Sequence, residues 1–175
     1  MLAGRNKTLK PQDVLLLLKI IVSKKGSWRI IDLAHDLEIS PSEITHGLER
    51  LKLSGLIDSE KRTPYKSAAL EFLIHGLKYV FPAQMGTISK GIPTAHSFYV
   101  NKKFVSDMNY VWESDKGEIK GISISPLYDS APNAAKKDEK LHRLLALIDS
   151  LRIGKAREQS YAKEELEKEF AKNEL

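Results

Sequence analysis

The chain of 175 residues contains no cysteine. Disulfides, thiolate zinc sites, iron-sulfur clusters and cysteine nucleophiles are therefore excluded. Long apolar runs are also missing, because the longest, residues 14–22, is interrupted by Lys19 and falls far short of the roughly 20 residues that cross a bilayer. The first ten residues lack the pattern of a secretion signal, so we expect a cytoplasmic protein that has no contact with a membrane.

No strong excess of one charge is present either, since 28 basic and 23 acidic residues give a formal net charge of +5. The composition is 42% hydrophobic and 29% charged, which is typical of a folded globular protein. The positive excess lies in the first 66 residues, which hold twelve basic and eight acidic side chains. An anionic partner is therefore expected to bind there.

Motifs of catalysis are absent as well: there is no Gly-x-Ser-x-Gly, no His-Glu-x-x-His and no carboxylate pair in an apolar setting. Glu71 and His75 have metal-ligand spacing, but a site would need a third group such as His96. The alternative is an ordinary pair on a helix surface. We therefore predict that the chain is not an enzyme and binds no metal or other cofactor.

The first third of the chain has the pattern of successive helices. Apolar residues at helical spacing follow Pro11 as far as Val22, and a second, shorter stripe runs from Ile30 to about Glu38. A third helix is predicted to begin only about three residues later. Two short helices joined so closely are typical of a helix-turn-helix.

The third helix has clear signals at both ends. In Ser40–Glu43, the serine can cap the helix, the proline suits its first position and the glutamate can reach back to the cap. Gly55 is placed to end the helix in a left-handed conformation. A strand at 56–59, a polar tip and a return at 64–66 then predict a small β-wing.

The segment Ser40–Asp58, SPSEITHGLERLKLSGLID, resembles the third helix and first wing strand of MarR-like winged helix-turn-helix regulators of bacteria. Their recognition helix typically ends in a Gly-Leu-Ile or Gly-Leu-Val step, here residues 55–57. The resemblance is drawn over residues 11–80, and the elements that carry it lie in residues 11–66. It implies duplex-DNA binding by a homodimer, with the third helix in the major groove and the wing on the backbone or minor groove.

Beyond Lys66 the sequence departs from the MarR pattern. The block His75–Ala95 resembles uncharacterised bacterial wing-helix proteins, a likeness that implies no activity.

On a helical wheel the third helix places Ile44, Leu48 and Leu51 inward, with polar residues opposite. Among the polar residues Arg50 has the reach for a bidentate contact to guanine, and wing cations can neutralise phosphates. The alternatives are a merely solvated helix face and a merely soluble basic hairpin. Glu49 would repel phosphate unless it pairs with a neighbour or binds a cytosine amine, and Leu53 also projects outward. The predicted DNA-binding residues are Ser42, Thr45, His46, Arg50, Lys61, Arg62 and Lys66.

The rest of the chain predicts a helix at 67–80 and an aperiodic loop at 83–96 that is either an ordered crossing or a partner-binding surface. A β-hairpin is predicted from residues 110–112 and 119–124. From about Ala134 a helix carries an apolar stripe, Leu141–Leu151, that suits either the core or a dimer interface, and a charged tail helix follows.

The predicted fold is therefore α+β and mainly helical. A winged helix-turn-helix domain (8–82) precedes a loop and β-hairpin (83–133) and carboxy-terminal helices (134–175) that form a possible dimerisation element. The predicted function is a transcriptional regulator that binds duplex DNA sequence-specifically, as a homodimeric repressor. The alternative is a wing-helix protein-interaction module, antitoxin-like or an adaptor subunit, that binds a partner chain through residues 83–96.

Overall fold

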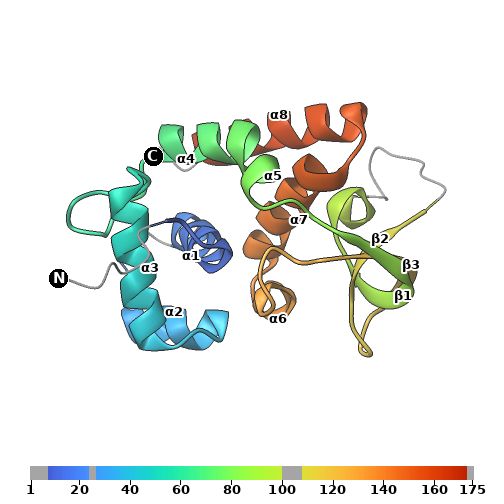
Figure 1. Ribbon diagram of the computed structural model, residues 1–175, viewed down its shortest axis with the longest axis horizontal. Coiled ribbons are helices and arrows are strands. Elements are labelled where there is room, and N and C mark those ends of the chain that lie inside the picture. Colours follow the sequence, from blue (N-terminus) through green and yellow to red (C-terminus); the bar gives the residue numbers. More distant parts are fainter. Residues whose placement is uncertain (1–7, 24–26, 100–107, 173–175) are drawn as a thin grey trace. The chain divides into compact units, whose positions relative to one another are not determined.

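The computed structural model describes residues 8–23, 27–99 and 108–172. The chain is mainly helical with a small sheet, so the expected α+β class is confirmed (Figure 1). It divides into two compact units, Met1–Ala69 (unit 1) and Leu70–Leu175 (unit 2). The boundary between the units falls inside the helix expected at 67–80.

Unit 1 is built on three helices: α1 (Pro11–Val22), α2 (Ile30–Leu37) and α3 (Pro41–Leu53). Each of the three contacts the other two. Because α1 is almost wholly apolar, it lies inside the unit, and its residues 14–18 are at most 1% exposed. Trp28, just before α2, is also buried.

The two ends of α3 confirm part of the predicted capping pattern. The Ser40 Oγ accepts a hydrogen bond from the Glu43 N–H at 3.2 Å, and Gly55 has the expected left-handed φ of 69°. The expectation that the Glu43 carboxylate reaches back to the cap is wrong. That carboxylate instead accepts hydrogen bonds from Arg50 and Gln12, because a buried cation attracts it more strongly than an exposed N–H group.

The predicted wing is a turn closed by a single β-bridge, Ile57 to Pro64. The Asp58 carboxylate holds this turn by accepting hydrogen bonds from the backbone N–H groups of Arg62 (2.7 Å) and Thr63 (3.1 Å). Lys61 adopts a left-handed φ of 61° at its tip. The two strands expected here are thus reduced to one pair of residues.

A continuous helical stretch follows, in three parts: α4 (Lys66–Glu71), the π-helix η1 (Phe72–Gly76) and α5 (Leu77–Val80). Its extent agrees with the helix predicted at 67–80, although the wide turn of the π-helix was not expected. Phe81 and Pro82 end it.

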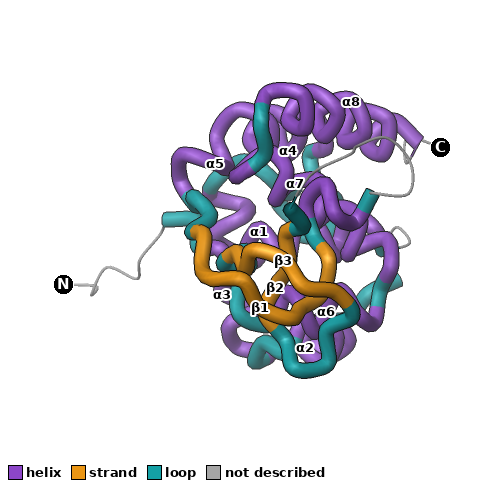
Figure 2. The backbone as a smooth tube through the Cα atoms, turned by 90° about the vertical axis from the view of Figure 1, so that its right-hand side faces the viewer, coloured by secondary structure: helices purple, strands orange, loops and turns teal. Residues whose placement is uncertain are grey.

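The sheet of unit 2 is a closed three-stranded barrel of β1 (Met85–Pro93), β2 (Tyr110–Glu113) and β3 (Ile119–Ile124) (Figure 2). β1 pairs antiparallel with both other strands, and β2 and β3 pair parallel with each other. Two predictions are therefore wrong: residues 83–96 are mostly strand rather than aperiodic loop, and β2 and β3 do not form a hairpin.

Two glycines explain this topology. Gly91 pairs with Glu113, the last residue of β2, on one side of β1 and with Ile119, the first residue of β3, on the other. The turn that connects β2 to β3 therefore crosses over β1 at Gly91. A Cβ added to Gly117 in that turn would lie 2.3 Å from the Gly91 Cα, and a Cβ on Gly91 would lie 2.2 Å from the Trp112 carbonyl oxygen. Only residues without side chains allow this crossing.

The remaining elements of unit 2 are the 3-10 helix η2 (Ala95–Phe98) and the helices α6 (Ala131–Lys137), α7 (Glu139–Ile153) and α8 (Ala156–Lys172). The apolar stripe of α7 is buried within this one chain, so of the two readings left open for it the core is correct. The apolar residues of α8 that pack inward are Ala162, Leu166 and Phe170.

A buried carboxylate ties α7 to the barrel. Asp149 is 1% exposed and accepts hydrogen bonds from the Thr94 hydroxyl (2.8 Å), the Trp112 indole N–H (2.8 Å) and the Arg152 guanidinium (2.7 Å). Arg152 also donates to the carbonyl oxygen of Phe81 at 2.8 Å. Burial raises the pKa of Asp149, although the charge of Arg152 opposes this effect.

Candidate nucleic-acid interface

The candidate interface in unit 1 is the pair of helices α2 and α3. They are joined by Glu38, Ile39 and Ser40, and Glu38 adopts a left-handed φ of 55° that turns the chain sharply after α2. The apolar residues Ile39, Ile44 and Leu48 are buried beneath the pair. Two short helices with a linkage of three residues are therefore present, as the sequence predicted.

The first two turns of α3 carry the predicted polar residues on their outer side. Ser42 and Thr45 are exposed, and the Thr45 hydroxyl donates a hydrogen bond to the Pro41 carbonyl oxygen at 2.9 Å. His46 is half-buried, with its Nδ1 3.8 Å from a carboxylate oxygen of Glu43. These three side chains lie where the sequence predicted them.

Arg50 does not lie where it was predicted. Its side chain is buried and donates two hydrogen bonds of 2.7 Å to the carboxylate of Asp13 at the start of α1. It donates a third, of 2.5 Å, to Glu43. The prediction that Arg50 belongs to the exposed face of α3 is wrong, because the buried carboxylate of Asp13 holds the guanidinium inside the unit.

The helical wheel fails at Arg50 because α3 packs against two helices and not one. Gly47 faces α1, and a Cβ there would lie 2.9 Å from a carboxylate oxygen of Asp13. This small residue makes room for the ion pair beside it. Burial opposes ionisation of Glu43, but hydrogen bonding to Arg50 and its charge outweigh burial and lower the pKa of Glu43.

The cations of the wing are less free than predicted. Lys61 forms an ion pair with Glu49 of α3, and this hydrogen bond lowers the pKa of Glu49. Pairing with a neighbour was one of the two arrangements expected for Glu49. Lys66, the first residue of α4, is half-buried.

Arg62 is exposed and anchored. Its guanidinium lies over the Trp28 ring, 4.6 Å from the ring centroid, and donates a hydrogen bond of 3.0 Å to the Trp28 carbonyl oxygen. The contact fixes the wing against the segment before α2.

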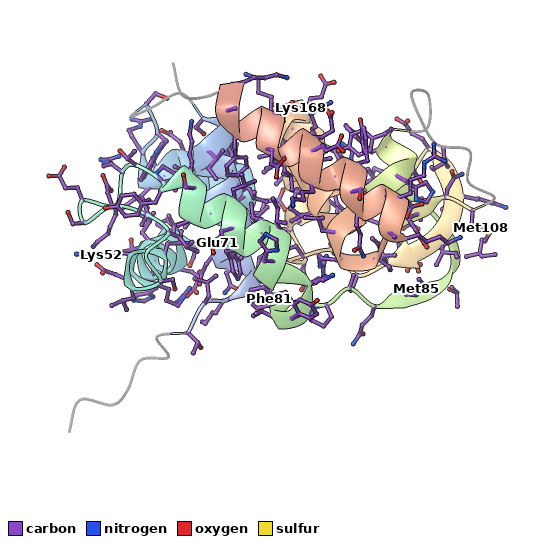
Figure 3. The ribbon with its side chains drawn as sticks, turned by 90° about the horizontal axis from the view of Figure 1, so that it is seen from above. Lys52, Glu71, Phe81, Met85, Met108 and Lys168 are labelled. Atoms are coloured by element: carbon purple, nitrogen blue, oxygen red, sulfur yellow. The ribbon has the colours of Figure 1, made fainter. Side chains whose placement is uncertain are left out.

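Lys52 and Leu53 are exposed residues of α3 that were not included in the predicted set. Lys52 follows Thr45 and Glu49 on the same row of the helix, and Figure 3 labels it. The spacing of these three residues was a signal that could have found it. Leu53 is 62% exposed.

No group of three or more histidine, aspartate or glutamate side chains suited to a metal occurs among the described residues. His96, the third ligand considered for Glu71 and His75, is buried in unit 2 with its Nε2 3.0 Å from the Met108 carbonyl oxygen. Within the same described ranges, no helix is both long and apolar enough to span a bilayer.

Comparison of the chain with protein-family models, with curated proteins and with solved structures finds no match. The resemblance to MarR-like regulators therefore stays a prediction.

Proposed function

We propose that unit 1 binds duplex DNA and that the chain is a sequence-specific regulator of transcription, acting as a homodimeric repressor. One observation carries the proposal. The second helix of a closely linked helix pair presents Ser42, Thr45 and His46 on its first turns while its other side is held in the unit by buried ion pairs. Recognition helices contact base edges through residues near their amino ends.

The wing supplies the contacts that do not depend on sequence. Arg62 is exposed and fixed on Trp28, and Lys52 follows Glu49, the partner of Lys61, on the same row of α3. Phosphate contacts of this kind fix the register of a protein on duplex DNA, and base contacts then supply the sequence preference. In this proposal Arg50 positions α3 and touches no base.

The proposed homodimer would place two α3 helices about one DNA turn apart. The carboxy-terminal helices offer limited support for it, because the apolar residues of α7 and α8 are already buried in unit 2. A dimer would need another surface of the chain. Light scattering on the purified protein measures this state directly.

The test is binding of the full chain to the duplex upstream of its own coding sequence and to unrelated duplex of equal length, at two salt concentrations. We expect a preference of about a thousandfold that persists at physiological salt. Thr45→Ala with His46→Ala should reduce the preference, whereas Arg62→Ala should weaken binding to both duplexes. Lys163→Ala in α8, which removes an exposed cation far along the chain, is the matched control.

Glu49→Gln makes the test sharper, because it removes a negative charge from the proposed interface and releases Lys61. Binding to every duplex should become tighter, with a steeper dependence on salt. Glu164→Gln, on the exposed side of α8, should have no effect. Equal weak binding of both duplexes by wild type, unchanged in the Glu49 variant, would reject the proposal.

A second candidate function is a protein-interaction module that binds through β1, and the outer face of the barrel favours it. Ile88 is 65% exposed, and Lys90 lies directly opposite Lys120 in the β1–β3 register. Like charges so placed repel each other. An acidic partner chain with an apolar side chain would relieve this repulsion, and Ile88→Ser with Lys90→Gln would then abolish its binding without changing DNA binding.

A further inference from the structure

Unit 2 contains a cavity of about 400 Å³ between the end of β1, the turn that follows β2 and the junction of α6 with α7. Ile92, Pro93 and Phe98 form an apolar wall. Cavities of this volume hold small metabolites, and most combine an apolar wall with a few polar groups. No part of the proposed DNA-binding function uses this cavity.

His142 supplies one polar group of the cavity. Its Nε2 lies 2.9 Å from the Pro93 carbonyl oxygen, which can only accept, so the proton is on Nε2. The ring is held between Phe98, at 4.3 Å between centroids, and Trp112, at 5.3 Å. Burial lowers the pKa of His142, although the hydrogen bond to Pro93 opposes this effect. The ring is therefore neutral at pH 7, and its Nδ1 is a fixed acceptor.

Charges of both signs surround the same cavity. Lys116 and Glu118 come from the turn after β2, Lys136 from the end of α6 and Glu139 from the start of α7. Within the described part of the chain none of these four side chains forms an ion pair. Two cations and two anions therefore border an apolar wall, and a ligand with both charges and an apolar body would complement them.

We propose that this cavity binds a small zwitterion with an apolar side chain, an α-amino acid of the size of leucine or phenylalanine. Lys116 and Lys136 bind its carboxylate, and Glu118 and Glu139 bind its ammonium group, with His142 Nδ1 as a further acceptor. The side chain of the ligand packs on Ile92, Pro93 and Phe98. The proposal does not depend on DNA binding, and its test involves no DNA.

The first experiment titrates the full chain with L-leucine and L-phenylalanine by calorimetry and by NMR of the His142 ring. We expect one saturable site with a dissociation constant below about 1 mM, which corresponds to roughly 4 kcal/mol. N-acetyl-L-phenylalanine and L-phenylalanine amide each lack one of the two charges, and each should bind at least tenfold more weakly. These derivatives also distinguish a free amino acid from a peptide terminus, which carries only one charge.

Paired variants locate the site. Lys136→Gln and Glu139→Gln should each weaken binding at least fivefold, because each removes one charge from the border of the cavity. Lys140→Gln and Glu164→Gln are the matched controls, since both residues are exposed and neither lines the cavity. The absence of saturable binding of either amino acid at about 10 mM overturns the proposal. Binding that the Lys136 and Glu139 variants leave unchanged overturns it as well.

Discussion

Each unit buries an aspartate against an arginine, but the two pairs join different kinds of structure. In unit 1, Arg50 of α3 reaches across to Asp13 of α1, so the pair links two helices that are far apart in sequence. In unit 2, Asp149 and Arg152 lie one turn apart on α7. Asp149 also accepts hydrogen bonds from Thr94 and Trp112 at the barrel, and Arg152 also donates one to the carbonyl oxygen of Phe81 at the end of α5.

The difference follows from the surroundings of each pair. A helix satisfies its own backbone, so the ion pair of unit 1 only has to fix how α3 lies on α1. The end of α5 and the barrel leave a backbone carbonyl, a hydroxyl and an indole N–H inside unit 2, and buried groups of this kind must be paired. Asp149 and Arg152 pair them. Removing the arginine of each pair should therefore destabilise the two units by different amounts.

Arg152→Leu should destabilise unit 2 most, by about 5 kcal/mol, because it leaves a fully buried carboxylate without its cation. Urea unfolding followed by the fluorescence of Trp112, with Trp28→Phe as the background, measures this loss. Lys163→Leu on the exposed side of α8 is the control. An equal, small effect of both changes would mean that the pair of unit 2 contributes little.

Arg50→Met should destabilise unit 1 by about 3 kcal/mol, because it leaves the buried carboxylate of Asp13 without its cation. The loss should be smaller than in unit 2, because Arg152 also donates a hydrogen bond to the backbone carbonyl oxygen of Phe81. Asp13→Leu added to Arg50→Met should restore much of the loss, since a buried pair can be replaced by apolar residues. Trp28 fluorescence in a Trp112→Phe background reports unit 1. A stable Arg50→Met protein that has lost its DNA sequence preference would instead make Arg50 a reader of bases.

Asp58→Ala should destabilise unit 1 by about 1 kcal/mol, because two N–H groups of the wing turn lose an acceptor but remain near water. Ser59→Ala, at the next residue, is the control and should have no measurable effect. Denaturant unfolding resolves a difference of this size. An Asp58→Ala protein as stable as wild type would show that the wing turn forms without this carboxylate.

Acid should distinguish the two units without any mutation. Burial opposes ionisation of Glu43 and Asp58, but hydrogen bonds outweigh it and their pKa values lie below the ordinary 4.5 and 3.8. Their contribution to stability is present above those ordinary values and is lost as the pH falls through the lowered pKa values.

For Asp149, burial raises the pKa above 3.8, so its contribution is complete below that value and decreases as the pH rises through the raised pKa. Between pH 5 and pH 2 we expect the Trp28 signal to change before the Trp112 signal. Asp149→Asn should bring the pH values at which the two signals change closer together, because the amide does not titrate. Loss of the Trp112 signal first would contradict this order.

Local signals in the sequence determined much of unit 1. Helical spacing, the Ser40 cap and Gly55 predicted α1, α2 and α3 close to their observed bounds, because these signals act within a few residues. The exposed positions of Ser42 and Thr45 followed from the same spacing. The wing turn was also predicted, although not that a single bridge would close it.

Only the tertiary structure decided the rest, because the deciding contacts join residues far apart in the chain. Arg50 has the spacing of an exposed residue, and its burial depends on a carboxylate 37 positions away. Likewise β2 and β3 have the alternation of a hairpin, and only the crossing of Gly117 over Gly91 makes them parallel. Local pattern measures how apolar a segment is, but the partner that a strand or a charge meets is set by the packing of the whole unit.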